Sequence, residues 1–180
     1  MNKIHEILIW LYFFKSFKSF KKYGKNIHLS FDGIFIRPEE ISFGDNIFIN
    51  KNFHISARNL NFGSNIMIGP NLVIECDNHK FNISGKKMWD IRESREIGAV
   101  SIEDDVWIGA NVTILPNVII REGTVIGAGS VVTKTLPPYS VCVGVPCRVI
   151  KRRFNEQQLN HHLNEVLSKY HFKDVLNYWD

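Results

Sequence analysis

A six-residue repeat runs through the chain from Ile41 to Thr135 with one interruption, and it restricts the fold more than any other feature. Two columns of mostly apolar residues recur six positions apart, and a single residue separates the two columns within each repeat. The first column consists of Ile41, Ile47, Phe53, Leu60, Ile66, Leu72, Val100, Val106, Val112, Val118, Thr124 and Ser130. The second consists of Phe43, Ile49, Ile55, Phe62, Ile68, Ile74, Ile102, Ile108, Ile114, Ile120, Ile126 and Val132. This alternation predicts short strands, because a helix of 3.6 residues per turn cannot maintain it.

The residue before the first column is equally regular at ten of its twelve positions. These residues are Asn46, Asn52, Asn59, Asn65, Asn71, Asp105, Asn111, Asn117, Gly123 and Gly129. Asn, Asp and Gly are the residue types that tolerate a left-handed backbone. Each repeat is therefore predicted to be a strand closed by a sharp corner, and three repeats are predicted to form one triangular coil of a parallel β-helix. One additional residue between Ala57 and Leu60 shifts the phase, and we interpret it as a bulge at a corner.

Composition narrows the functional classes. The chain has 180 residues, of which 44% are hydrophobic, and this predicts one globular domain with a substantial core. A net charge of +4, without a basic stripe interleaved with aromatic residues, argues against a nucleic-acid partner. The three cysteines are odd in number and lack metal-ligand spacing. They indicate a reducing cytosol rather than a disulfide framework, and no metal is expected.

Both ends of the chain are predicted to be helical. Residues 3–22 have an apolar helical face followed by lysines, and the apolar run is too short to span a bilayer. We expect this helix to cap the open end of the prism, and the alternative is a helix lying weakly on an anionic membrane surface. A second helix is predicted from Glu156 to Tyr170 with Asn155 as its N-cap. Its adjacent His161 and His162 would point to different faces, so a shared metal site is not expected.

The interruption of the repeat is the candidate functional segment. After Ile74 the hexads stop, and they resume at Val100. The excursion over residues 75–99 is polar, contains Trp89, and has His79 as its single histidine. A long loop leaving a rigid scaffold is a common place for function.

The stretch VWIGANVTILPNVIIREGTVIGAGSVVTKTLPPYSVCVGVPCRVIKRR, Val106 to Arg153, resembles the hexapeptide-repeat acyltransferases. The most similar subgroup is that of the maltose, galactoside and polysaccharide O-acetyltransferases. The resemblance covers residues 25–153 and is dense from residue 100 onward. It implies that the predicted all-β parallel β-helix, over residues 25–153, is left-handed. With the two helices predicted above, the chain divides into an N-terminal helix in residues 1–24, the β-helix, and a helical tail in residues 154–180. It also implies a homotrimer with acetyl-CoA bound between neighbouring subunits.

The resemblance assigns a role to His79. In the family, a histidine on such a loop is the general base that takes a proton from the acceptor hydroxyl or amine as it attacks the thioester. An imidazole suits this role because much of it is neutral near pH 7. Asp77, or Glu75, is a candidate for fixing the orientation of the His79 ring. Some relatives add an asparagine from the preceding coil, and the candidates here are Asn52, His54, Arg58 and Asn59.

The resemblance also suggests where acetyl-CoA would bind. Trp107 points outward between the inward Val106 and Ile108, in the position that lies beside the pantetheine arm in the family. Gly109 and Ala110 are expected to offer backbone N–H groups to the thioester oxygen, and Ala110 supplies only an amide where some relatives have a serine hydroxyl. The remaining expected contacts are Ala128 and Thr133 to pantetheine and adenine, and Arg148 and Lys151 to the phosphates.

The expected activity is acetyl-CoA-dependent O-acetylation of a carbohydrate hydroxyl, in surface polysaccharide biosynthesis in the cytoplasm or at the inner face of the membrane. Alternatives are N-acetylation of a nucleotide-linked amino sugar and acetylation of an antibiotic alcohol, because both would use the same base and co-substrate. A zinc hydratase on the same scaffold is rejected, since the repeat offers only His54 and His79 as histidine ligands.

Overall fold

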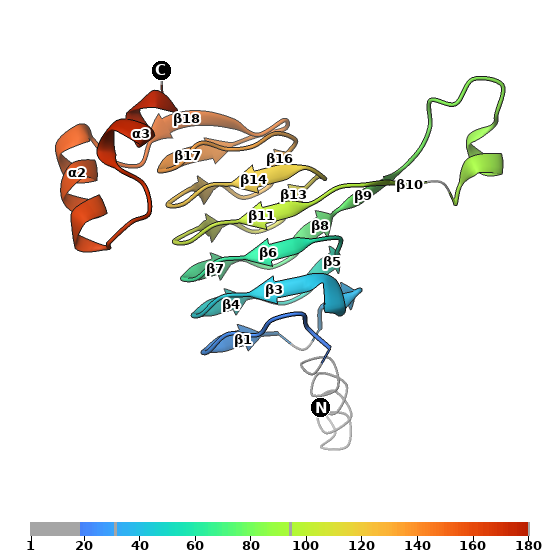
Figure 1. The fold of residues 1–180 in the computed structure, drawn as a ribbon, viewed down its shortest axis with the longest axis horizontal. Helices are drawn as coiled ribbons and strands as arrows, with labels where there is room; N and C mark the ends of the chain where they lie inside the picture. Colours follow the sequence, from blue (N-terminus) through green and yellow to red (C-terminus); the bar gives the residue numbers. More distant parts are fainter. Residues whose placement is uncertain (1–18, 31, 94, 180) are drawn as a thin grey trace, which may run out of the picture.

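The computed structural model describes residues 19–30, 32–93 and 95–179. These residues form a triangular prism of stacked parallel strands, an arm that leaves the prism, and two C-terminal helices (Figure 1). The predicted all-β parallel β-helix is confirmed. Each side of the prism is one sheet in which strands of successive coils pair parallel and in register, and only the last strand of the seven-stranded sheet, Arg148–Arg152, pairs antiparallel with its neighbour among the described residues.

Three sheets make up the prism. The seven-stranded sheet contains, in order, β1 (Ile27–Leu29), β4 (Ile47–Ile49), β7 (Ile66–Ile68), β12 (Trp107–Ile108), β15 (Val125–Ile126), β17 (Ser140–Val143) and β18 (Arg148–Arg152). The five-stranded sheet contains β2 (Ile34–Ile36), β5 (His54–Ser56), β8 (Val73–Glu75), β13 (Thr113–Ile114) and β16 (Val131–Val132). The four-stranded sheet contains β3 (Ile41–Phe43), β6 (Leu60–Phe62), β11 (Val100–Ile102) and β14 (Val118–Ile120). The short 3-10 helix η1 (Pro38–Glu40) precedes β3.

The two apolar columns of the repeat form the core, and their residues from Ile41 to Val132 are buried. The predicted corners also form: the ten Asn, Asp and Gly residues named above as preceding the first column all have positive φ, as at Asn65 (60°) and Asn71 (62°). Asparagine side chains of successive coils hydrogen-bond in ladders at these corners, for example Asn52 Nδ2 to Asn71 Oδ1 at 2.7 Å. The additional residue near position 57 lies at the corner between β5 and β6, where Ala57 is fully buried.

The N-terminal prediction is tested only at its end. Residues 1–18 of the expected helix over 3–22 lie outside the described residues. Residues 19–22 are not helical, and Lys22 forms a parallel bridge with Ser42. Phe20 packs edge-on against Phe35 and Phe43, with ring centroids 5.1 Å apart in each pair, so an aromatic side chain does cover the first coil.

The C-terminal prediction is partly wrong. Asn155 caps α2 (Glu156–Glu165) as expected, in a reciprocal capping box with Gln158, but the helix ends five residues earlier than predicted. Leu167 adopts a left-handed backbone (φ 51°), and a separate helix, α3 (Phe172–Asn177), follows. At this reversal the Ser168 hydroxyl donates to the buried carboxylate of Glu122 and accepts from the Tyr139 hydroxyl of the prism, which ties the turn to the prism.

No helix in the described ranges is both long and apolar enough to span a membrane. The same residues contain no group of three or more His, Cys, Asp or Glu side chains arranged to bind a metal ion.

Candidate active site

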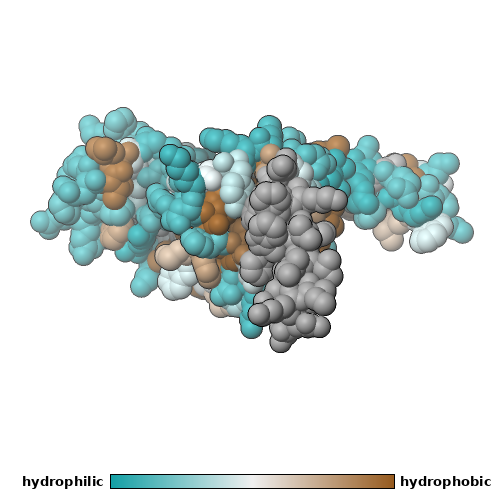
Figure 2. Space-filling view, turned by 90° about the horizontal axis from the view of Figure 1, so that it is seen from below, coloured by the Kyte–Doolittle hydropathy of each residue, from teal (hydrophilic) through white to brown (hydrophobic). Residues whose placement is uncertain are grey.

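The excursion over residues 75–99 forms an arm that projects sideways from the prism (Figures 1 and 2). Its root is an antiparallel ribbon of β9 (Asp77–His79) and β10 (Arg95–Ile97), and its tip carries the 3-10 helix η2 (Met88–Ile91). The chain leaves the coil at Cys76 and returns at Gly98, whose N–H donates to the Cys76 carbonyl at 2.9 Å. The arm therefore begins and ends at one corner of the prism.

His79 is held through one ring nitrogen. Its Nδ1 lies 2.6 Å from the backbone carbonyl oxygen of Arg92. Because a carbonyl only accepts, this contact assigns the proton of the neutral ring to Nδ1 and leaves Nε2 as a proton acceptor. His79 is exposed, so Nε2 can reach an acceptor molecule.

A cavity of about 270 Å³ lies beside His79. It is lined by His79, Lys80, Phe81, Met88, Trp89 and Arg92. The Arg92 guanidinium covers one face of the Trp89 ring, 4.7 Å from its centroid, while 72% of the Trp89 surface is exposed. The cavity thus combines a proton acceptor with apolar and aromatic walls, a combination typical of small-molecule sites.

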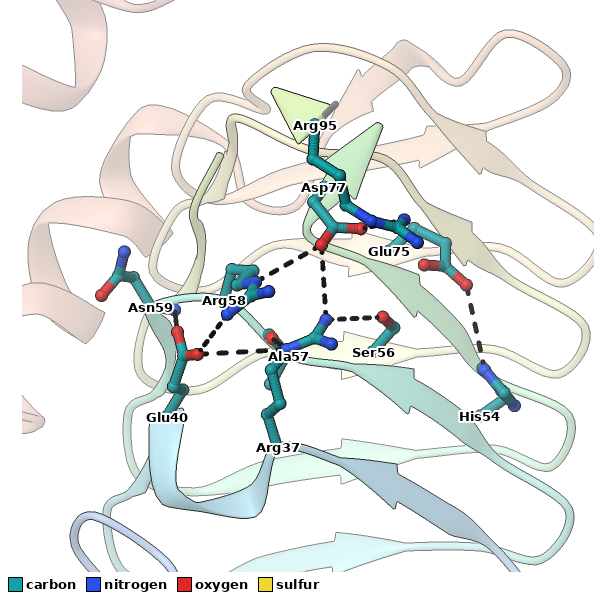
Figure 3. A network of polar contacts seen from close by, with 10 residues as sticks. All are labelled: Arg37, Glu40, His54, Ser56, Ala57, Arg58, Asn59, Glu75, Asp77 and Arg95. Atoms are coloured by element: carbon teal, nitrogen blue, oxygen red, sulfur yellow. Dashed lines mark hydrogen bonds and ion pairs between the residues drawn. The ribbon is translucent and has the colours of Figure 1, made fainter. Parts of the chain in front are cut away.

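Asp77 does not bind the His79 ring directly, contrary to one of the sequence-based candidates. Its side chain is only 4% exposed and faces the guanidinium groups of Arg37, Arg58 and Arg95, at 3.5, 3.3 and 3.5 Å (Figure 3). The carbonyl of Arg92 takes the role that a carboxylate was expected to fill. A backbone carbonyl offers no sequence signal, so this partner could not have been found from residue types.

Glu75 and the four candidates from the preceding coil differ in where their side chains lie and in what they bind. Glu75 Oε1 lies 3.9 Å from Nε2 of His54, on the outer face of the five-stranded sheet. Asn52 belongs to a corner ladder, and the Asn59 N–H donates to Glu40. Arg58 contacts Asp77 and also Glu40, at 2.8 Å, and hydrogen bonding to Glu40 raises the pKa of its guanidinium. His54 is therefore the candidate that remains on an open face.

Trp107 points outward from the seven-stranded sheet, as predicted, and is 52% exposed. Strand pairing places it between Met67 of β7 and Val125 of β15. A second cavity of about 270 Å³ lies here, lined by Met67, Asp105, Val106, Trp107, Val125 and Arg153. Arg153 pairs with Asp105 at 2.6 Å at one side of this cavity.

The two cations proposed for phosphate binding project from the same sheet face as Trp107. Val141 of β17 pairs with Val125 and with Lys151, so Lys151 continues the column of Trp107. Val143 pairs with Arg148. Residues three apart on a regular strand would face opposite sides, but a register shift in the β17–β18 pair brings Arg148 and Lys151 to one side. The sequence gives no indication of this shift.

Gly109, Ala110 and Ala128 lie at the corner between the seven-stranded and five-stranded sheets. Backbones approach closely here: a Cβ on Gly109 would lie 2.6 Å from the Ala128 nitrogen. The Gly109 N–H donates to the Ile126 carbonyl at 2.8 Å, so the expectation that it faces a thioester oxygen is wrong. Within the described ranges, no acceptor is bonded to the Ala110 N–H, which leaves this amide as the candidate donor.

Comparison with known proteins identifies the family. Residues 99–134 match the family described as bacterial transferase hexapeptide (six repeats). A galactoside acetyltransferase solved in complex with coenzyme A is similar to the chain, with 32% identity, coverage of 81% of this chain and 70% of that one, and a TM-score of 0.69. The chain belongs to the hexapeptide-repeat transferase family.

Two other members of this hexapeptide-repeat family extend the likeness. Galactoside O-acetyltransferase from Escherichia coli (strain K12) is 34% identical over 140 residues, which span 76% of this chain and 64% of that protein. The chain thus spans less than two thirds of that relative. A hexapeptide-repeat-containing acetyltransferase from Vibrio cholerae O1 biovar eltor, solved with acetyl coenzyme A, shows 27% identity and a TM-score of 0.70, over 78% of this chain and 75% of that one.

The candidate residues of this hexapeptide-repeat chain fall into two groups on different edges of the prism. Ala110 and Ala128 lie on the edge between the seven- and five-stranded sheets, next to the face that bears Trp107. The arm with His79 leaves the edge between the five- and four-stranded sheets, after β8 and before β11. Thr133, which follows β16, lies on the same edge as the arm. One chain therefore does not bring His79 and Ala110 together.

Proposed function

We propose that the protein is an acetyl-CoA-dependent acetyltransferase that acts on a sugar hydroxyl, with His79 as the general base. The observation that carries the proposal is the His79 ring, whose Nδ1 is fixed by the Arg92 carbonyl while the ring borders an open cavity. Family membership and the solved relatives with coenzyme A or acetyl coenzyme A support the choice of co-substrate.

In the proposed reaction, Nε2 of His79 takes the proton of the acceptor hydroxyl as its oxygen attacks the thioester carbonyl carbon. The new C–O bond forms, the C–S bond breaks, and the His79 imidazolium returns the proton to the departing sulfur. The Ala110 N–H stabilises the negative charge that develops on the carbonyl oxygen, and such a donor contributes about 3–4 kcal/mol. The sugar would lie in the cavity with its apolar face against Trp89.

The binding face fits a long anionic co-substrate. Arg148 and Lys151 project from one side of the sheet, so both cations could bind the phosphate groups of one ligand. Trp107 lies three strands from Lys151, which is about 14 Å at the usual strand spacing. At the neighbouring corner Ala128 and Gly129 are exposed, and their small size leaves room for a thin chain.

We further propose that the site is completed between copies of the chain in a homotrimer. The separation of His79 and Thr133 from Ala110, Ala128 and Trp107 onto different edges supports a site shared by two subunits. The exposed side chains Phe81, Met88 and Trp89 on the arm also favour a neighbouring surface. A role in surface polysaccharide biosynthesis and a cytoplasmic location are part of the proposal, in keeping with three cysteines that are free and buried.

The test is a panel of acceptors incubated with acetyl-CoA, including galactosides, maltose, nucleotide-linked sugars and amino sugars. Thiol release and a mass increase of the acceptor report transfer, and the buried cysteines should give little background. The proposal predicts an ester product that mild alkali cleaves. An alkali-stable amide on an amino sugar would support N-acetylation instead, and release no faster than hydrolysis with every acceptor would contradict an acetyltransferase.

A further inference from the structure

The arm that carries His79 has little to hold it in place. All three residues of β10 are exposed, and β9 is buried only at Asp77. A two-stranded ribbon by itself is marginally stable in water. If the base must be held within a fraction of an ångström of a reacting hydroxyl, the ribbon has to be fixed at its root.

Asp77 is the first residue of the ribbon, and three segments converge on it. Its Oδ2 lies 3.5 Å from Arg37 Nη2 and 3.3 Å from Arg58 Nε, and its Oδ1 lies 3.5 Å from Arg95 Nη1 (Figure 3). Arg37 comes from the coil that contains β2, and Arg58 comes from the corner after β5. Arg95 comes from the returning strand β10, so one buried carboxylate links two coils of the prism to both strands of the arm.

The arginines are themselves fixed. Arg37 Nε donates to the Ala57 carbonyl at 2.7 Å and its Nη2 donates to Ser56 Oγ at 3.1 Å. Arg58 Nη1 donates to Glu40 Oε1 at 2.8 Å. Their guanidinium groups therefore present a preset site to Asp77, rather than following it on flexible side chains.

The geometry of the ribbon connects this cluster to the base. His79 and Arg95 are directly opposite each other in the antiparallel register, so both side chains lie on one face. Asp77 is two residues before His79 and shares that face. The Arg92 carbonyl that binds His79 lies three residues before Arg95. A change in the angle at which the ribbon leaves Asp77 would therefore displace both the imidazole and the carbonyl that holds it.

We propose that Asp77 is a positioning residue, which sets the direction of the arm by binding Arg37, Arg58 and Arg95 and thereby places His79 for catalysis. This inference rests on the proposed function of His79. In this proposal the carboxylate does not bind the His79 ring itself but fixes the direction of the whole ribbon. The charge of Asp77 therefore affects catalysis by holding the arginines, and not by changing the protonation of the imidazole.

The test compares Asp77→Asn with Arg95→Gln in the full-length protein. Asp77→Asn removes the negative charge that the three arginines share and replaces one acceptor oxygen by an NH2 group, and Arg95→Gln releases only the returning strand. Glu96→Gln is the matched control, since Glu96 is exposed on the opposite face of the same strand. The measurements are kcat, KM for acetyl-CoA, the pH–rate profile, and amide hydrogen exchange over residues 78–97 and 100–135.

Asp77→Asn is expected to lower kcat by roughly 10- to 100-fold, and Arg95→Gln by roughly 3- to 10-fold, with KM for acetyl-CoA little changed. Exchange should quicken over residues 78–97 and stay constant over 100–135, and the acid limb of the pH profile should keep its position. Glu96→Gln should match the wild type in each measurement.

Wild-type kcat in Arg95→Gln would overturn the proposal, and this variant carries the test if Asp77→Asn does not fold. A lowered kcat with unchanged exchange and a displaced acid limb would also overturn it, because Asp77 would then act on the imidazole by its charge. Loss of the proposed function is a separate result: it would appear as an active His79→Ala enzyme, whereas the exchange measurement needs no activity.

Discussion

The asparagine ladders at the corners allow the stability of the β-helix to be tested at one residue. Asn71 has a left-handed backbone with φ of 62°. Its side chain accepts a hydrogen bond from Asn52 at 2.7 Å and donates one to Asn111 at 2.8 Å. Asn71→Ala removes both bonds and leaves a Cβ in a left-handed conformation, whereas Asn71→Gly removes both bonds and tolerates that conformation.

The two substitutions separate the two contributions to the free energy of unfolding. Two exposed hydrogen bonds contribute about 1–2 kcal/mol together. A left-handed conformation costs an alanine about 1–2 kcal/mol, whereas asparagine offsets this cost through local hydrogen bonds of its side chain. Asn71→Gly should therefore destabilise the protein by about 1–2 kcal/mol, and Asn71→Ala by about 2–4 kcal/mol. For a chain of this size, the losses correspond to decreases in Tm of roughly 2–8 °C and 4–16 °C.

Thermal unfolding followed by far-ultraviolet circular dichroism measures both effects. All variants must be compared at one protein concentration, because the Tm of an assembled protein depends on it. The order of Tm should be wild type, then Asn71→Gly, then Asn71→Ala. A glycine variant that melts at or below the alanine variant would refute the argument that the corner selects residues by their left-handed backbone.

Three further predictions concern binding and the end of the prism. Arg148→Ala and Lys151→Ala should each raise KM for acetyl-CoA more than they lower kcat, because contacts to remote phosphates bind ground state and transition state alike. Equal wild-type rates with acetyl-pantetheine and acetyl-CoA would exclude the phosphate role. Trp89→Ala should raise KM for the sugar and leave KM for acetyl-CoA unchanged, and the opposite pattern would remove Trp89 from the acceptor cavity. Phe20→Ala should lower the stability by about 2–4 kcal/mol, since Phe20 covers Phe43 at the open end of the first coil. An unchanged Tm in this variant would mean that Phe20 does not protect that end.

Most of the prism could be predicted from the sequence, because the same residue pattern recurs in every hexad. An inward aliphatic pair and a left-handed corner residue recur at fixed phase, and each coil contacts only the coils above and below. The C-terminal region has no such repetition. Its helix α2 ends at Glu165, the backbone turns at Leu167, and the next residue, Ser168, binds the buried carboxylate of Glu122, 46 positions away in the sequence.

The sequence names candidate site residues, whose roles stay predictions, but it does not indicate how they are arranged. His79 could be found because it is the single histidine of the excursion. Its partner, the Arg92 carbonyl, has no sequence signature. Asp77 binds a residue 40 positions before it, Arg37 in an earlier coil, and the shared face of Arg148 and Lys151 depends on a strand register. Both are properties of tertiary structure, which the periodicity does not describe.

The central claim is that His79 acts as the base in acetyl transfer. The most direct measurement compares kcat and the acetyl-CoA dissociation constant of His79→Ala with those of the wild type, using the best acceptor of the panel. Asn78→Gln is the control, because Asn78 precedes His79 on the opposite face of the ribbon. We predict that His79→Ala lowers kcat by at least about 10²-fold and leaves acetyl-CoA affinity nearly intact, while Asn78→Gln remains active. A His79→Ala enzyme with kcat close to wild type would contradict the account.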